Sequence, residues 1–172
     1  MNLLDYLPAV PNFPKPGIIF RDISPLLENA AAFHEAIFQL HQLTEELDYT
    51  HILGIESRGF IFGSALALHA NKGLILARKA HKLPLATYQA SYGLEYGSDS
   101  LEIQQSIIPA CAKVLLLDDV LATGGTLLAA AELVKKTEAT ICSALTLLEI
   151  TSLDGSKKLS ENHLQHQSLL KI

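Results

Sequence analysis

The sequence predicts an α/β domain built on an open, mainly parallel sheet with helices on both faces. Short apolar runs recur along the chain, and the segments between them carry apolar residues at helical spacing. Buried strands that alternate with amphipathic helices are typical of parallel sheets. The chain has 172 residues, of which 49% are hydrophobic and 18% charged. These values fit one folded domain that spans residues 1–172.

The N-terminal third predicts a cap, a helix and a strand. The segment 11–17, PNFPKPG, cannot form a regular helix or a central strand, because proline lacks a backbone donor. Apolar residues between Phe33 and Leu47 fall on one face of a helix. The run at 51–55, HILGI, then predicts the first strand of the sheet.

The remainder of the chain continues the alternation. A helix is predicted over 58–70 and a strand over 73–77. The polar, glycine-containing region at about 79–100 predicts a flexible loop. Three further elements follow it, namely a strand at 114–117, a helix at 127–136 and a strand at 141–150.

Composition excludes several classes of function. Thirteen basic and eighteen acidic residues give a net charge of −5, so we expect no nucleic-acid partner. No apolar run is long enough to cross a bilayer, and the N-terminus lacks the pattern of a secretory signal. The expected compartment is therefore the cytoplasm. Cys111 and Cys142 form no C-x-x-C pair, and Cys142 is expected to be a reduced, buried residue.

The stretch VLLLDDVLATGGT, at 114–126, carries the strongest functional signal. Its apolar run ends in Asp118 and Asp119, and in open α/β sheets ligands bind beyond the carboxyl ends of the strands. Successive strand residues point to opposite faces, so the two carboxylates have different neighbours. Each can accept hydrogen bonds from sugar hydroxyls or help to organise a hydrated cation.

The glycines that follow predict a phosphate cradle. Gly124 and Gly125 let backbone amides approach a ligand, and Thr123 and Thr126 add hydroxyl donors at the start of a helix. The stretch matches neither G-x-x-x-x-G-K-[ST] nor G-x-G-x-x-G. The alternative is an ordinary strand–turn–helix junction with an exposed pair of aspartates.

The apolar run, the Asp pair and the Thr-flanked glycines together resemble the phosphoribosyl pyrophosphate motif of type I phosphoribosyltransferases. Four further segments resemble the adenine phosphoribosyltransferase family and occur in that family's order. They are NFPKPGIIFRDISPLL at 12–27, GIESRGFIFG at 54–63, RK with KLP between 78 and 84, and SYGLEYG at 91–97.

The resemblance implies both a fold and a reaction. The implied fold has a five-stranded parallel core and an N-terminal hood, mainly residues 1–30. The implied reaction joins adenine to phosphoribosyl pyrophosphate and gives AMP and pyrophosphate. It requires Mg²⁺, which we expect to be held through the diphosphate and water, with no direct protein ligand. The family is usually a homodimer.

The resemblance also assigns roles to residues around the sugar and its phosphates. Ala122, Thr123, Gly124, Gly125 and Thr126 would hold the 5′-phosphate. Asp118 and Asp119 would face the ribose hydroxyls.

The diphosphate would be contacted by basic residues outside this stretch, with Arg58 closest and Lys79 and Lys82 reaching it from the loop. An arginine at a helix N-terminus is unfavourable unless an anion compensates, which supports a ligand role for Arg58. The alternative for all three basic residues is a solvated surface position.

The base would lie under the hood. The main chain of Ile19, Phe20 and Arg21 would read the edge of adenine, with Ile19 against the ring and Arg21 supporting the hood; the alternative for Ile19 is core packing. Glu95 would assist proton transfer from the base, unless it is simply a solvated carboxylate. Tyr96 would close over the site.

Two alternatives to adenine transfer follow from the same residues. One is a non-catalytic nucleotide sensor, although this chain has no extra length for a DNA-binding module. The other is transfer to hypoxanthine, guanine or xanthine, which usually requires a side-chain donor at the 6-oxo edge. Ala80 and His81 stand where the family pattern has Pro-Gly or Arg-Gly, and the segment 161–172 matches no family ending.

Overall fold

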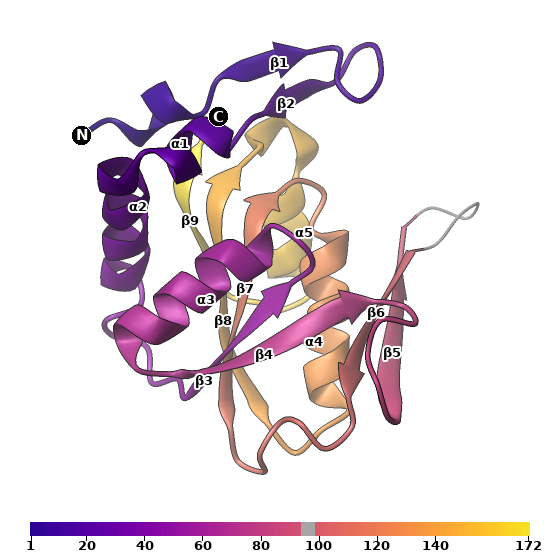
Figure 1. Cartoon of the computed structure of the whole chain (residues 1–172). Coiled ribbons are helices and arrows are strands. Elements are labelled where there is room, and N and C mark those ends of the chain that lie inside the picture. Colours follow the sequence, from indigo (N-terminus) through magenta and orange to yellow (C-terminus); the bar gives the residue numbers. More distant parts are fainter. Residues whose placement is uncertain (94–98) are drawn as a thin grey trace.

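The computed structural model describes residues 1–93 and 99–172 of the chain. A seven-stranded sheet with the strand order β5-β6-β4-β3-β7-β8-β9 forms its centre (Figure 1). The strands of this sheet are β3 (His51–Ile55), β4 (Gly73–Lys79), β5 (Thr87–Tyr92), β6 (Asp99–Gln104), β7 (Lys113–Leu121), β8 (Thr140–Glu149) and β9 (His166–Lys171).

Five of these strands, β4-β3-β7-β8-β9, pair in parallel and confirm the expected five-stranded core. The strand β7 is longer than the apolar run that predicted it, because the run continues through Asp118 and Asp119 to Leu121. The strand β9 comes from the C-terminal segment, which carried no expectation from sequence, and completes one edge of the sheet.

The region at 79–100 differs from the flexible loop that the sequence predicts. The strands β5 and β6 pair antiparallel from Thr87↔Gln104 to Tyr92↔Asp99, and β6 joins the edge of β4. Period-two alternation explains the hairpin, because Ala90, Leu101 and Ile103 all point into the core. Polar residues on the other face of the hairpin lower the overall hydrophobicity of this region, so the strands do not stand out as apolar runs in the sequence.

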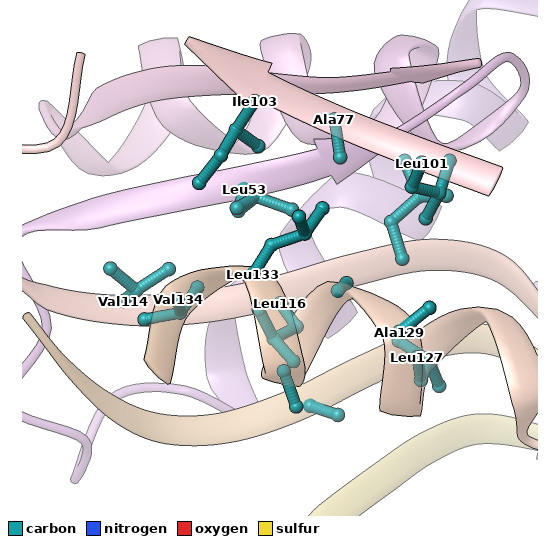
Figure 2. Close-up of a cluster of buried hydrophobic side chains, with 14 of the residues drawn as sticks. Leu53, Ala77, Leu101, Ile103, Val114, Leu116, Leu127, Ala129, Leu133 and Val134 are labelled. Atoms are coloured by element: carbon teal, nitrogen blue, oxygen red, sulfur yellow. The ribbon is translucent and has the colours of Figure 1, made fainter. Parts of the chain in front are cut away.

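Helices cover both faces of the sheet, as predicted. The helices α2 (Ala30–Gln42) and α3 (Gly59–Ala70) pack on one face, where Phe62, Leu66 and Leu115 are fully buried. The helix α4 (Gly125–Lys135) covers the other face, together with the short helix α5 (Gly155–Glu161). Figure 2 shows the second core, with side chains from α4 and from several strands filling the space between them.

The helix predicted over 33–47 ends earlier than its apolar pattern. The helix α2 stops at Gln42, and Leu43 is its C-cap. The hydroxyl of Thr44 donates to the carbonyl oxygen of His41 at 2.8 Å and so satisfies one of the free carbonyls of the last turn. The chain then turns through 43–46 toward β3.

The first 28 residues form the hood. It contains the 3₁₀ helix η1 (Leu3–Tyr6), the strands β1 (Ala9–Pro11) and β2 (Ile19–Arg21), and the short helix α1 (Ser24–Glu28). The strands β1 and β2 pair antiparallel, and Figure 1 shows this hairpin beyond the carboxyl ends of β7 and β8. Leu3, Leu7 and Leu26 anchor the hood in the same core as α2 and α3. No helix in the described part of the chain is long and apolar enough to span a membrane.

Candidate functional site

The paired aspartates lie at the carboxyl end of β7 and are both buried. This burial contradicts the alternative of an exposed pair at an ordinary junction. An oxygen of Asp118 accepts the backbone N–H of Asp119 at 2.9 Å. Burial raises the pKa of Asp118 well above its usual value, and the neighbouring charge of Asp119 raises it further. Burial also raises the pKa of Asp119, whereas the charge of Arg58 opposes that shift.

Arg58 joins the aspartates to the hood. Its Nε lies 2.8 Å from Oδ2 of Asp119, and its guanidinium lies 4.9 Å from the centroid of the Phe20 ring. The contact with Asp119 is an ion pair, and Oδ2 of Asp119 has no hydrogen-bond partner in the described residues. A second atom, Nη1 of Arg58, also lacks a hydrogen-bond partner there. Arg58 is therefore half-buried against Asp119 and Phe20, and the carboxylate of Asp119 compensates its positive charge at the N-terminus of α3.

The glycine stretch leads from β7 into α4 as the sequence predicts. Gly124 is the N-cap of α4 with φ +79°, a left-handed conformation that glycine adopts readily. No side chain caps this helix, so the amides of its first turn remain available to an anion. A Cβ on Gly125 would lie 3.9 Å from Oγ1 of Thr123 and from Cβ of Tyr92, which are ordinary van der Waals contacts, so the fold itself does not require glycine here.

A cavity of about 280 Å³ joins these parts. It is lined by Glu56, Ser57, Arg58, Tyr92, Asp118, Asp119, Val120, Ala122 and Thr126. A smaller pocket of about 50 Å³ beside it includes Thr123 and Gly124 and shares Asp118, Ala122 and Thr126 with the larger one. The structure thus brings together the two aspartates, Arg58 and the predicted cradle.

The two predicted lysines do not line this cavity, but each binds a carboxylate beside it. Nζ of Lys82 lies 2.6 Å from Oε1 of Glu56, and Nζ of Lys79 lies 2.9 Å from Oδ2 of Asp99. The hydrogen bond to Asp99 and the negative charge of that residue raise the pKa of the Lys79 ammonium. His81, which stands in place of the family glycine, has φ +64°, so this turn keeps a left-handed residue without a glycine.

The hood residues are placed for contact with a ligand. Ile19 is 61% exposed, which rules out the alternative of core packing for this side chain. The ring of Phe20 packs edge-on against Phe13, with 5.1 Å between centroids. Arg21 donates to the carbonyl oxygen of Leu7 at 3.1 Å and so ties β2 to the start of the hood. Glu95 and Tyr96 lie outside the described residues.

Two residues that line the cavity, Glu56 and Tyr92, enter the sequence reasoning only as parts of family-like segments: Glu56 lies in the stretch that resembles the family's pyrophosphate loop, and Tyr92 lies in 91–97. The hydroxyl of Tyr92 donates to Asp99 at 3.4 Å, within the last residue pair of β5 and β6. Burial and the nearby charge of Asp99 raise the pKa of this phenol. The alternation of Tyr88, Ala90 and Tyr92 is the sequence signal that indicates an inward-facing tyrosine here.

The family described as "Phosphoribosyl transferase domain" matches residues 23–163, so this parallel sheet, with its Asp pair and the glycine turn into α4, is that of a phosphoribosyltransferase. An adenine phosphoribosyltransferase of Polynucleobacter asymbioticus is 67% identical over 171 residues, which cover 99% of each chain. The chain therefore belongs to the adenine phosphoribosyltransferase family.

Solved structures agree with this membership. The crystal structure of the adenine phosphoribosyltransferase of Thermoanaerobacter pseudethanolicus matches with a TM-score of 0.94 and 40% identity, covering 99% of this chain and 100% of that one. The enzyme of Saccharomyces cerevisiae, complexed with an imino-altritol bisphosphate and adenine, matches with a TM-score of 0.90 and 40% identity, covering 98% and 96%.

Proposed function

We propose that the cavity at the carboxyl end of β7 is the active site of this enzyme. The chain acts in purine salvage: it transfers the 5-phosphoribosyl group of phosphoribosyl pyrophosphate to adenine and releases AMP and pyrophosphate. The observation that carries the placement is the convergence of the buried Asp pair, Arg58 and the uncapped N-terminus of α4 on one cavity.

The 5′-phosphate is held by the backbone from Ala122 to Thr126. The left-handed Gly124 turns the chain, and the free amides of the first helical turn face an anion. The hydroxyls of Thr123 and Thr126 add donors. Gly125 supports this placement, because a Cβ there would make only ordinary contacts within the fold, and close approach of a ligand to the main chain accounts for a glycine at this position.

The ribose lies against Asp118 and Asp119. Oδ2 of Asp119 is buried without a hydrogen-bond partner, so a sugar hydroxyl would satisfy it. Cleavage of the bond between C1 and the diphosphate develops positive charge on the sugar, which buried carboxylates stabilise. Arg58 has an unpartnered Nη1 that suits an oxygen of the diphosphate.

Mg²⁺ is the metal that this chemistry implies, bound mainly to phosphate oxygens and water. The residues fit that mode, because two buried carboxylates, those of Asp118 and Asp119, line the cavity. The carboxylates of Asp118 and Asp119 would hydrogen-bond the ion's waters. When bound, the ion neutralises charge on the departing diphosphate.

Adenine enters under the hood, between the exposed side chain of Ile19 and the end of the sheet. Backbone groups of Ile19 to Arg21 read its edge, and Phe20 holds Arg58 below it. Glu95 takes part in proton transfer from the base and Tyr96 closes over it; both assignments rest on the family resemblance. Closure would also exclude water from the charged sugar.

The enzyme acts as a homodimer in this proposal, and a face of α3 and β4 supports it. Ile61 and Leu68 on α3 and Leu74 and Leu76 on β4 form the α3–β4 patch of exposed, large apolar side chains. Leu68 is 86% exposed, and surfaces of this kind mark contacts between proteins. The free thiols of Cys111 and Cys142 suit the cytoplasm as its compartment.

The dimer is tested by sedimentation of Leu68→Glu beside Leu153→Glu, a matched change at an exposed leucine outside the patch. We expect wild type and Leu153→Glu to sediment as dimers and Leu68→Glu as a monomer. A wild-type monomer at micromolar concentration, or a dimer that survives Leu68→Glu, would contradict the proposed interface.

The reaction is tested by pyrophosphate release with each purine base in turn. We expect release with adenine and none above background with hypoxanthine, guanine or xanthine, because the hood offers backbone groups rather than a side-chain donor for a 6-oxo edge. Release with a 6-oxo purine but not adenine would overturn the substrate. No release with any base, together with retained AMP binding, would favour the sensor.

A further inference from the structure

Glu56 is a buried carboxylate at the carboxyl end of β3 that the proposed chemistry does not use. Its side chain is 7% exposed and lines the cavity beside Ser57 and Arg58. It receives the ammonium of Lys82 at 2.6 Å and the backbone N–H of Lys79 at 2.8 Å. The guanidinium of Arg78 adds two longer hydrogen bonds, from Nε at 3.3 Å and from Nη2 at 3.4 Å.

These contacts keep the carboxylate ionised. Burial pushes the pKa of Glu56 up, but the hydrogen bonds from Lys82, the Lys79 amide and Arg78 outweigh it and hold the pKa at about 2. The negative charge of Glu56 therefore faces the positive side chains of Arg78 and Lys82, and these three residues together carry a net charge of about +1 beside the cavity. Arg78 also donates to the carbonyl oxygen of Lys82 at 3.3 Å, so the turn itself is fixed at both its backbone and its side chain.

The arrangement matters because a lysine side chain is flexible. Its long stem loses rotamer entropy when it is held in one conformation. The Glu56 contact immobilises the Lys82 stem before any ligand arrives and places its ammonium 2.6 Å from an atom of the cavity wall. A diphosphate that enters the cavity then meets a cation already in place, so less of its binding energy is lost to ordering.

We propose that Glu56 is a positioning residue, which holds Lys82 at the diphosphate side of the cavity for the incoming phosphoribosyl pyrophosphate. The inference rests on the proposed role of Lys82 as a diphosphate contact. The alternative is an ion-pair cluster that only stabilises the turn after β4.

The test compares Glu56→Gln, Lys82→Met and the double variant in steady-state transfer to adenine. We expect Glu56→Gln to raise the KM for phosphoribosyl pyrophosphate about tenfold, the loss expected for one charge-assisted hydrogen bond. The KM for adenine and kcat should change less than about twofold, because neither the hood nor the aspartates touch Glu56. In the Lys82→Met background, Glu56→Gln should add little, since its effect acts through the lysine.

Glu102→Gln is the matched control. Glu102 is another buried carboxylate near the same turn, but it accepts the backbone N–H of His81 at 3.2 Å and no lysine. We expect its KM for phosphoribosyl pyrophosphate to match wild type. Thermal melts of all variants separate the change in KM from a change in stability. A purely structural role of Glu56 would lower Tm without a selective rise in the KM for phosphoribosyl pyrophosphate.

Two results would overturn the role of Glu56 while leaving the function intact. One is an active wild type with an unchanged KM in Glu56→Gln; the other is a full, additive loss in the Lys82→Met background. An inactive wild type would overturn the proposed function and this role with it.

Discussion

Gly124 and Gly125 are neighbours in one loop, yet the structure gives them different tasks. Gly124 is needed for the path of the chain, because its φ is +79° and a Cβ there would lie 3.2 Å from both the carbonyl oxygen of Gly155 and Cδ2 of Leu159. Gly125 begins α4, and a Cβ on it would make only ordinary van der Waals contacts, at 3.9 Å from Thr123 and Tyr92. Replacing each by alanine therefore separates folding from ligand binding.

The magnitudes follow from these two environments. A left-handed residue costs about 1–2 kcal/mol when it carries a Cβ, and the crowding at Gly155 adds to this cost. Gly124→Ala should lower the free energy of unfolding by about 2 kcal/mol and Tm by about 4–8 °C for a chain of this size. Gly125→Ala should keep or slightly raise Tm, because alanine favours a helix over glycine by up to about 1 kcal/mol.

Binding should show the opposite order. Gly125→Ala should weaken AMP about tenfold or more, since its methyl group occupies the space in front of the first-turn amides and costs at least one charge-assisted hydrogen bond. Differential scanning fluorimetry measures Tm, and calorimetric titration with AMP measures affinity. A Gly125→Ala protein that binds AMP like wild type would refute the placement of the phosphate, and a wild-type Tm for Gly124→Ala would refute the conformational argument.

Three further changes test other parts of the site. Folding raises the pKa of Asp118, so the ionised carboxylate lowers the free energy of unfolding at pH values above that raised pKa. This loss of stability disappears as the pH falls toward the pKa of the unfolded chain. Asp118→Asn should therefore raise Tm more at pH 8 than at pH 4, while kcat falls. Ile19→Ala should raise the KM for adenine about tenfold through lost apolar contact. Ile18→Ala, at an exposed neighbour outside the proposed base contact, should leave that KM unchanged in the same assay. Tyr92→Phe should keep Tm within about 2 °C, since the ring still packs, and raise the KM for phosphoribosyl pyrophosphate a few-fold; an unchanged KM would mean that the phenol contacts no substrate.

The parts of the site that the sequence predicts are those whose signals are local. The Asp pair, the glycines and the start of α4 lie within thirteen residues, 114–126, so their geometry follows from a strand, a turn and a helix N-terminus. Arg58 was placed by the same logic, because it follows a strand whose carboxyl end faces the ligand edge.

The features that escaped prediction depend on tertiary pairing. The bond between Glu56 and Lys82 joins residues 26 positions apart, and only the register of β3 against β4 brings them together. The β5–β6 hairpin and β9 were missed because both carry polar residues on an open face, which dilutes their alternation. The ion pair between Arg58 and Asp119 cannot be predicted from sequence either, because each residue taken alone is explained by a ligand contact.

Unsatisfied polar atoms connect the stability of this fold to its function. Five buried side-chain nitrogen or oxygen atoms in the described residues lack a hydrogen-bond partner, and three of them, in Arg21, Arg58 and Asp119, belong to the hood and the cavity. Each such atom costs about 1–3 kcal/mol in a folded protein, so their concentration at one place opposes folding there. In the proposed function, the hydroxyls and the diphosphate of the substrate would supply hydrogen-bond partners for Asp119 and Arg58. We therefore expect phosphoribosyl pyrophosphate to raise the Tm of the enzyme, and an unchanged Tm at saturating substrate would contradict this link.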